Sequence, residues 1–208
     1  MRELRKACVG EVFDYGILMS MLSYLKAPHR KITELLKSGD IVRIKKGLYI
    51  FGEDYRHSPV HLGQLANLIY GPSYVSQEYA LYWYGLIPER VDLVMSMTTG
   101  RKKLFQTPVG VFQYTYINVE RFTVGIDWQS IDDQQHFLIA SPEKALADTV
   151  ADQNQLQNTD DMREHLSENL RIEDDMILDL NLDRMQKIQL AYRKPVVTLL
   201  FRTLKEGI

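Results

Sequence analysis

Two places in this sequence hold side chains of the types that catalysis uses. His57 and His61 are four residues apart, but Pro59 lies between them, so a shared helical face is not expected. Zinc would also need more ligands than this pair supplies. The second place is the segment from Glu143 to Asp148, where two carboxylates and an intervening lysine form a set that could serve a nuclease.

The two carboxylates of this segment also have a structural interpretation. Ser141, Pro142 and Glu143 have the order of a helix start: a capping hydroxyl, a proline at the first position and an acid near the positive end of the helix. Asp148 lies in a pattern typical of a solvated helix face. Both readings stay open, and we favour the structural one.

Other catalytic signatures do not occur in the sequence. Cys8 is the one cysteine, which excludes a disulfide within the chain and a four-cysteine zinc site. There is no glycine-rich phosphate loop, no nucleophile elbow and no His-Glu-x-x-His motif. We therefore expect no catalytic residue, no metal site and no cofactor, and we expect that the protein is not an enzyme.

Charge is distributed very unevenly along the 208 residues, although the net charge is only −2. Residues 1–51 contain ten Lys and Arg against five Asp and Glu, whereas residues 52–208 contain fifteen against twenty-two. Residues 151–183 are the most acidic, with ten acids and two bases. A basic module on an acidic body is typical of a nucleic-acid-binding head, although modules of this charge also occur in domains that bind nothing.

Local signals in the basic module predict three helices. Residues 2–8 have helical spacing, and Asp14 is suited to cap a helix that continues through residues 17–22. Pro28 fits the first position of a third helix, where its missing N–H costs nothing. Gly39 fits the end of that helix, because glycine adopts positive φ without strain.

A two-stranded hairpin is expected after the third helix. Residues 41–45 alternate like a half-buried strand, and residues 48–51 return after a tight turn. A short extended piece at 11–13 precedes the second helix. This order of elements is that of a winged helix-turn-helix over residues 1–52, in which the third helix enters the major groove and the hairpin contacts the DNA backbone.

Eight side chains on the third helix and the hairpin are the candidate DNA-binding residues. They are His29, Arg30, Lys31, Thr33, Lys37, Arg43, Lys45 and Lys46. Basic groups neutralise phosphates and release counterions, and Arg30 is the best candidate to read a base because a guanidinium can bond the edge of guanine at two points. Each of these residues could instead be part of a solvated face, and some winged helices bind only protein.

The rest of the chain predicts a mixed domain followed by a helical extension. We expect a linker at 53–59, helices over 60–70 and 77–86 with Ser76 as a cap, strands over 92–98, 103–107, 109–118, 122–128 and 137–140, and helices from 141 and from about 159 onward. The fold class is therefore α+β: a winged helix-turn-helix at 1–52, a domain with antiparallel strands at 53–155, and a helical part at 156–208 that packs on it.

Three separated blocks of the sequence resemble one family. Residues 10–15 and 32–50 form the first block, whose most recognisable part is Leu-x-x-Gly-x-Ile-x-Arg-x-x-x-Gly-x-Tyr from Leu36 to Tyr49. Residues 71–81 and 140–148 form the second and third blocks. Together they resemble bacterial abortive-infection antitoxins, the AbiE-type antitoxins of type IV toxin–antitoxin systems.

The resemblance implies a DNA-binding autorepressor of a two-gene operon. Its partners would be the double-stranded operator DNA of its own operon and, directly or indirectly, a nucleotidyltransferase-like toxin that the later domain counters. The positions that match the DNA-reading helix and hairpin are Arg30, Lys31, Thr33, Lys37, Arg43, Lys45 and Lys46. Family members often have Ser or Arg where this chain has Lys31 and Glu34, so the operator sequence does not carry over.

The sequence therefore leads to a transcription regulator and antitoxin as the first hypothesis. One alternative is a protein-interaction module in which the winged helix docks protein, and a less favoured one is a cryptic nuclease. The charged start of the chain and its short apolar runs predict a cytoplasmic protein without a membrane partner.

Overall fold

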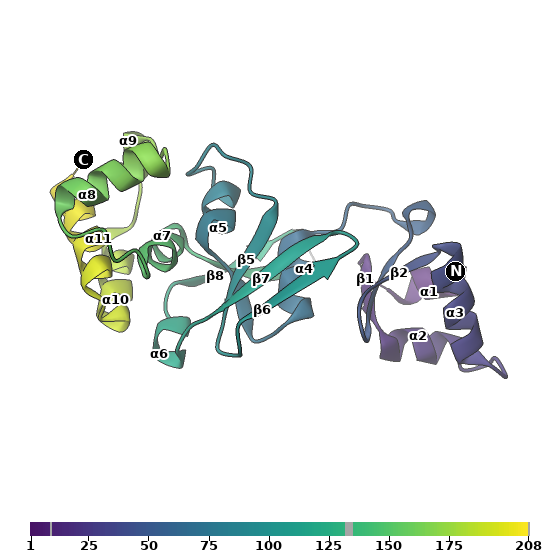
Figure 1. Ribbon diagram of the computed structural model, residues 1–208. Coiled ribbons are helices and arrows are strands. Elements are labelled where there is room, and N and C mark those ends of the chain that lie inside the picture. The colour runs from purple at the N-terminus through teal and green to yellow at the C-terminus, as the bar shows by residue number, and fades with distance from the viewer. Residues whose placement is uncertain (9, 132–134, 208) are drawn as a thin grey trace.

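The computed structural model describes all residues except 9, 132–134 and 208, and it has three parts that follow one another along the sequence (Figure 1). A small sheet with three helices forms the N-terminal part, a larger sheet lies in the centre, and helices form the C-terminal part. The chain is thus a mixed α+β protein with a helical C-terminal part, which confirms that level of the sequence prediction.

The N-terminal part consists of α1 (Arg2–Ala7), β1 (Val12–Asp14), α2 (Tyr15–Leu22), α3 (Pro28–Ser38), β2 (Ile41–Lys45) and β3 (Leu48–Phe51). Strand β3 lies between β1 and β2 and is antiparallel to both. The expected local signals are confirmed. The Asp14 carboxylate accepts a hydrogen bond from the Ile17 amide at 2.8 Å, Pro28 begins α3, and Gly39 follows α3 with φ of +80°.

The three helices bury apolar side chains against one face of this small sheet. Ile32 and Leu35 of α3 are buried together with Phe13 and Phe51 from the strands. Leu36, expected in the same buried stripe, is only half-buried. The opposite side of α3 therefore faces solvent, as its alternation of apolar and polar residues requires.

The second face of the β2–β3 hairpin is covered as well. Ile44, Leu48 and Ile50 belong to the hydrophobic core of the central part, so every residue of β3 is buried. Apolar surface on both sides of one strand joins the two cores, and the N-terminal part is packed against the centre of the molecule.

The segment at 53–59, expected to be a linker, is held in place by contacts. It begins with a short 3₁₀ turn, η1 (Glu53–Tyr55). The buried carboxylate of Glu11 accepts hydrogen bonds from the backbone amides of His57 and Ser58 at 3.1 and 3.2 Å, and it also forms an ion pair with Arg5 at 2.9 Å. The connection is therefore anchored to the N-terminal part.

The central part consists of α4 (Leu62–Ile69), β4 (Ser73–Val75), α5 (Gln77–Trp83), β5 (Leu93–Thr98), β6 (Lys103–Thr107), β7 (Gly110–Tyr116), α6 (Val119–Phe122), β8 (Ile126–Ser130), β9 (His136–Ala140) and α7 (Pro142–Val150). The six strands have the order β6-β7-β5-β4-β9-β8. The pairs β5–β7 and β4–β9 are parallel and the others antiparallel, so the sheet is mixed.

The strands expected over 109–118 and 122–128 are present as β7 and β8, but β7 ends at Tyr116 and β8 begins at Ile126. The helix between them, α6, was not predicted; it begins where the Asn118 side chain accepts a hydrogen bond from the Arg121 amide at 3.1 Å. Ser76 precedes α5 but makes no side-chain capping bond; its hydroxyl donates to Asp148 at 2.6 Å.

Helices α4 and α7 cover opposite faces of the central sheet. The Tyr114 hydroxyl donates to the carbonyl of Ala66 in α4 at 2.6 Å, whereas the Tyr74 hydroxyl donates to Asp148 in α7 at 3.0 Å. Tyr114 and Val75 are aligned with the same residue of β5, so they share a face, and Tyr74 points to the other face. The face bearing α4 adjoins the N-terminal part, and α7 adjoins the C-terminal helices (Figure 1).

The C-terminal part consists of α8 (Thr159–Glu164), a π-helical turn η2 (His165–Asn169), α9 (Asp174–Leu178), α10 (Leu182–Tyr192) and α11 (Pro195–Glu206). Buried residues such as Met185, Ile188 and Leu200 belong to the same core as the central sheet. Within the described residues, no helix combines the length and the apolar character that crossing a bilayer requires.

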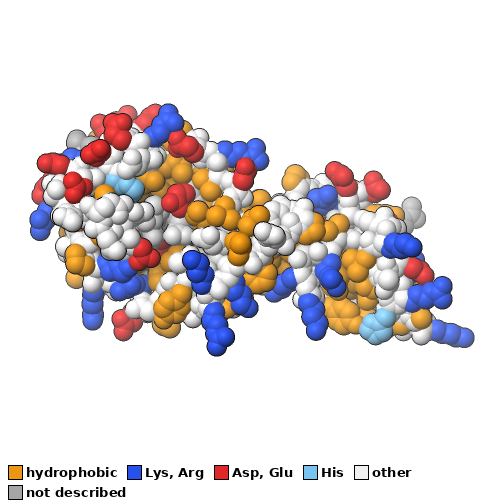
Figure 2. All heavy atoms as spheres, viewed as in Figure 1, with side chains coloured by type: hydrophobic (Ala, Val, Ile, Leu, Met, Phe, Trp, Pro, Cys, Tyr) orange, Lys and Arg blue, Asp and Glu red, His pale blue; other side chains and the backbone are white. Residues whose placement is uncertain are grey.

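The acidic character of residues 151–183 has a local explanation. Acidic side chains gather over α8 and α9 on the face shown in Figure 2. Asp160 and Asp161 lie in the first turn of α8, and Asp174 and Asp175 lie in the first turn of α9. Carboxylates at helix N-termini are stabilised by the exposed backbone amides there, so these acids suit the starts of two short helices.

Candidate nucleic-acid interface and a buried polar centre

The solvent face of α3 carries a group of polar and basic side chains. All five residues predicted from this helix are exposed: His29, Arg30, Lys31, Thr33 and Lys37. The Arg30 side chain has 83% of its surface exposed. Helix α3 has 11 residues and is therefore about 16 Å long. The major groove of DNA is about 12 Å wide, which is enough to admit an α-helix.

One acidic residue lies among these cations. Glu34 forms ion pairs with Arg30 at 3.3 Å and with Lys31 at 3.6 Å. The Glu34 side chain is 53% exposed, and water screens pairs of this kind, so each contributes only a few tenths of a kcal/mol. Arg30 can therefore leave Glu34 at small cost when a better acceptor is offered.

The N-terminal end of α3 is connected to the tip of the hairpin. The Tyr15 hydroxyl lies 3.2 Å from His29 Nδ1, and the two rings stack with centroids 6.4 Å apart. The Tyr15 amide in turn donates to the carbonyl of Gly47 in the hairpin turn at 3.0 Å. Tyr15 was not singled out from the sequence, because its role depends on the packing of α2 between α3 and the hairpin.

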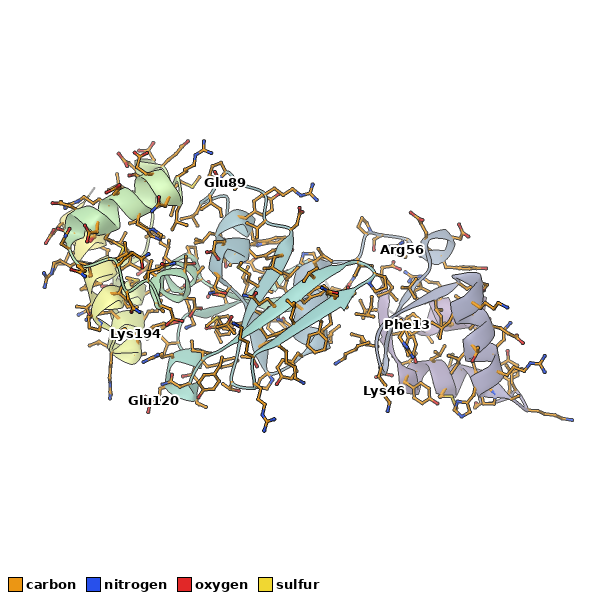
Figure 3. All side chains as sticks on the ribbon, in the orientation of Figure 1. Phe13, Lys46, Arg56, Glu89, Glu120 and Lys194 are labelled. Atoms are coloured by element: carbon orange, nitrogen blue, oxygen red, sulfur yellow. The ribbon has the colours of Figure 1, made fainter. Side chains whose placement is uncertain are left out.

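Neighbouring lysines at the hairpin tip have different surroundings. Arg43 and Lys46 are exposed, and Lys46 lies at the tip in Figure 3. Lys45 is half-buried, and its ammonium donates to the carbonyl of Ile69 at the end of α4. Burial lowers the pKa of Lys45, and the nearby charge of Lys103 lowers it further. Lys45 thus contacts the central part, whereas Lys46 faces solvent.

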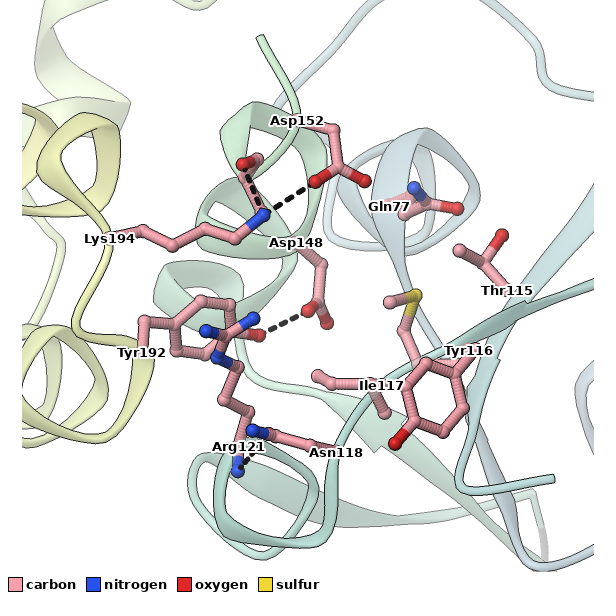
Figure 4. Close-up of a pocket in the computed structure, with 12 residues that line it drawn as sticks. Gln77, Thr115, Tyr116, Ile117, Asn118, Arg121, Asp148, Asp152, Tyr192 and Lys194 are labelled. Atoms are coloured by element: carbon pink, nitrogen blue, oxygen red, sulfur yellow. Dashed lines mark hydrogen bonds and ion pairs between the residues drawn. The ribbon is translucent and has the colours of Figure 1, made fainter. Parts of the chain in front are cut away.

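A separate polar centre is buried on the other side of the molecule, between α7 and the C-terminal helices. Asp148 is only 4% exposed, so the expectation of a solvated face at this position is wrong. Its carboxylate accepts hydrogen bonds from the hydroxyls of Tyr74, Ser76 and Tyr192 (Figure 4 shows the last of these). The reason for the error is that these donors lie far from Asp148 in the sequence.

Lys144 is the cation of this centre and is fully buried. Its ammonium donates to the Tyr192 hydroxyl at 2.7 Å and to the Arg121 carbonyl at 2.8 Å, and it lies 3.9 Å from the Asp148 carboxylate. Burial lowers the pKa of Lys144 to about 8, although Asp148 opposes this shift. Burial and the neighbouring carboxylate raise the pKa values of Tyr74 and Tyr192 well above the ordinary tyrosine value.

Glu143 joins the centre to the C-terminal part. Its carboxylate accepts hydrogen bonds from the Ser141 hydroxyl and from the backbone amide of Asn181, both at 2.8 Å. The Ser141 side chain also accepts from the Lys144 amide at 3.3 Å, which confirms its predicted role as the cap of α7. Glu143 therefore has the position expected at a helix start, together with a long-range contact that holds the start of α10.

The hydrogen bonds of Glu143, Lys144 and Asp148 hold these three side chains to other parts of the fold. Glu143, Lys144 and Asp148 each have hydrogen-bond partners within the fold and little contact with solvent. Among the residues that the structure describes, no three His, Cys, Asp or Glu side chains are grouped so that they could hold a metal ion.

No family model matches the chain, and no curated protein matches its sequence.

Proposed function

We propose that this protein is a cytoplasmic DNA-binding transcriptional regulator whose N-terminal part is a winged helix-turn-helix. The observation that carries the proposal is the surface made by α3 and the hairpin tip, where Arg30 and Lys46 are both exposed. The order of the elements and the β1-β3-β2 sheet support this reading, because a winged helix presents its third helix and its hairpin to DNA together.

The contacts within this surface support a division of roles. Arg30 is near the start of α3, the end from which recognition helices reach base edges, and its partner Glu34 holds it only weakly. Lys46 is at the hairpin tip, within reach of the phosphate backbone. Arg30 would then read a base, and Lys46 would contribute to affinity for any sequence.

Binding to duplexes at two salt concentrations tests this proposal. The duplexes are the DNA upstream of the protein's own gene and a scrambled sequence, and fluorescence anisotropy measures the affinity. Arg30→Ala should cost about 1–3 kcal/mol on the upstream DNA and little on the scrambled duplex. Lys46→Ala should weaken both equally and lower the slope of log affinity against log salt by about one.

A matched control is Lys187→Ala, since Lys187 is an exposed lysine on α10, in the C-terminal part of the chain. This change removes the same charge and should alter neither affinity nor salt slope. Equal loss on both duplexes for Arg30→Ala would show that Arg30 contacts phosphate. Absence of salt-dependent binding to either duplex would overturn the proposal.

We further propose that the protein acts as an antitoxin, and this step rests on the resemblance of its three sequence blocks to AbiE-type antitoxins. The partner would be a nucleotidyltransferase-like toxin encoded by the adjacent gene. Co-expression with that gene in a bacterial host tests the proposal: the full chain should restore growth. A double variant, Arg30→Ala with Lys46→Ala, should still restore growth while failing to repress the operon. Toxicity that persists when the unaltered full chain is present would refute the antitoxin role.

A further inference from the structure

A cavity of about 190 Å³ lies beside the buried polar centre. Its walls come from the end of β7, from α6, from the start of α5, from the end of α7 and from the segment that joins α10 to α11 (Figure 4). Polar side chains from opposite walls face the same hollow, with Arg121 on one side and Gln77 on the other. Such a concave site with a few convergent polar groups has the character of a ligand site.

Most of the charges around the cavity are neutralised within the fold. Lys194 forms an ion pair with Asp152 at 2.5 Å and donates to the Ala151 carbonyl at 2.8 Å. Lys144 and Asp148 form the pair described above. The two acids and two bases of these pairs balance, and the charge of Arg121 is left over.

Arg121 has no anionic partner among the described residues. Its guanidinium lies over the Tyr192 ring, 5.6 Å from the centroid, and its Nε is buried with no hydrogen-bond partner in the part of the chain that the structure describes. A buried donor without a partner is costly, and a guanidinium binds phosphate or carboxylate oxygens through paired hydrogen bonds. The cavity is therefore suited to an anionic group.

The opposite wall also offers groups without partners. The side-chain oxygen of Gln77 is buried and accepts no hydrogen bond from any described residue, and the backbone of Gln77 has φ of +56°, an unusual value for a residue other than glycine. The ring of Tyr116 lines the cavity and is 60% exposed, so one face is free to stack on a flat organic group.

We infer that this cavity binds a small phosphorylated ligand with a planar ring, its phosphate held by Arg121 and its ring placed against Tyr116. Gln77 would accept a hydrogen bond from the same ligand. The chemistry is that of a nucleoside monophosphate, either free or as the terminal nucleotide of an oligonucleotide. This inference does not depend on the proposed DNA-binding surface, which lies in the N-terminal part.

Isothermal titration of the full chain with inorganic phosphate, adenosine, AMP and a 5′-phosphorylated dinucleotide tests the inference. AMP should bind more tightly than either phosphate or adenosine, because it alone combines both recognised groups. Tighter binding of the dinucleotide than of AMP would assign the site to an oligonucleotide end, and the reverse would assign it to free nucleotides.

Three variants separate recognition from folding. Arg121→Met should weaken AMP binding about 10- to 100-fold, since a charge-assisted bond is lost, and Arg101→Met, which removes an exposed arginine elsewhere, should not. Tyr116→Ala should weaken AMP binding but leave phosphate binding unchanged. Because the Tyr116 ring is 60% exposed, its removal takes little packing from the fold. AMP binding that is absent, equal to that of phosphate, or unaffected by Arg121→Met would overturn the inference.

Discussion

Replacing Lys144 by Met should change how the stability of the protein depends on pH. The Lys144 ammonium is buried against Tyr192 and Asp148, and burial lowers its pKa to about 8 from the ordinary 10.5. Between these two values the unfolded chain holds a proton that the folded protein has released. The free energy of unfolding must then rise with pH, by at most about 1.4 kcal/mol per pH unit.

The useful window for this measurement is pH 8 to 10. Well below pH 8 both the folded and the unfolded states bind the proton on Lys144, so the residue adds no slope there. Above pH 10, Tyr74 and Tyr192 act in the opposite direction, because their raised pKa values mean that the unfolded state loses protons first. Two pH units at the limiting slope correspond to about 2–3 kcal/mol.

Urea denaturation of the wild type and of Lys144→Met at pH 7, 8, 9 and 10 measures the effect. The difference in unfolding free energy should change little between pH 7 and 8 and should then grow in favour of the wild type by about 2–3 kcal/mol up to pH 10. Lys187→Met, at an exposed lysine, should show no such growth. Parallel curves for wild type and Lys144→Met across the window would refute the reasoning, because they would show that Lys144 keeps its charge in the fold.

Three further predictions concern the N-terminal part and can be checked by thermal and urea denaturation. Leu35→Ala should lower the free energy of unfolding by about 2–5 kcal/mol, and Leu36→Ala by less, because Leu36 is only half-buried; equal losses would contradict this packing. Gly52→Ala should destabilise by about 1–3 kcal/mol or more, because a Cβ there would lie 1.8 Å from a backbone carbonyl oxygen that cannot rotate away, and a neutral result would contradict it. Lys45→Met should cost about 1 kcal/mol through loss of its bond to the end of α4, whereas Lys46→Met should leave the Tm unchanged; similar effects of both would refute the observed orientations.

Several element boundaries in the sequence were predictable because one side chain acts on its own turn. Asp14 and Ser141 cap helices, Pro28 begins a helix and Gly39 ends one, as the sequence indicates. Each of these signals is local, since it depends on φ, on a missing N–H or on an amide three residues away. Two positions depart from this: Ser76 precedes a helix but its hydroxyl bonds to a distant carboxylate, and the cap that Asn118 provides for α6 was not predicted.

Exposure was predictable for α3 but only partly for the hairpin. The apolar stripe of α3 shows which side of the helix is buried. The five candidate residues of this helix lie outside that stripe and are exposed. Lys45 and Lys46 are adjacent and chemically identical, so the sequence does not distinguish them. Their difference arises from α4, whose terminal carbonyl lies within reach of Lys45 alone.

The sequence by itself therefore determined the mixed fold class, the bounds of the helices in the N-terminal part, and the basic face of α3, because these depend on short-range periodicity and on the residues next to them. The tertiary structure alone decided the surroundings of Asp148, which bonds to Tyr74 and Tyr192, 74 and 44 residues away along the chain. It also decided that Arg121 faces a cavity and has no anionic partner among the residues that the structure describes. Burial and pairing of a charge depend on which distant elements pack around it, and no local pattern of residues contains that information.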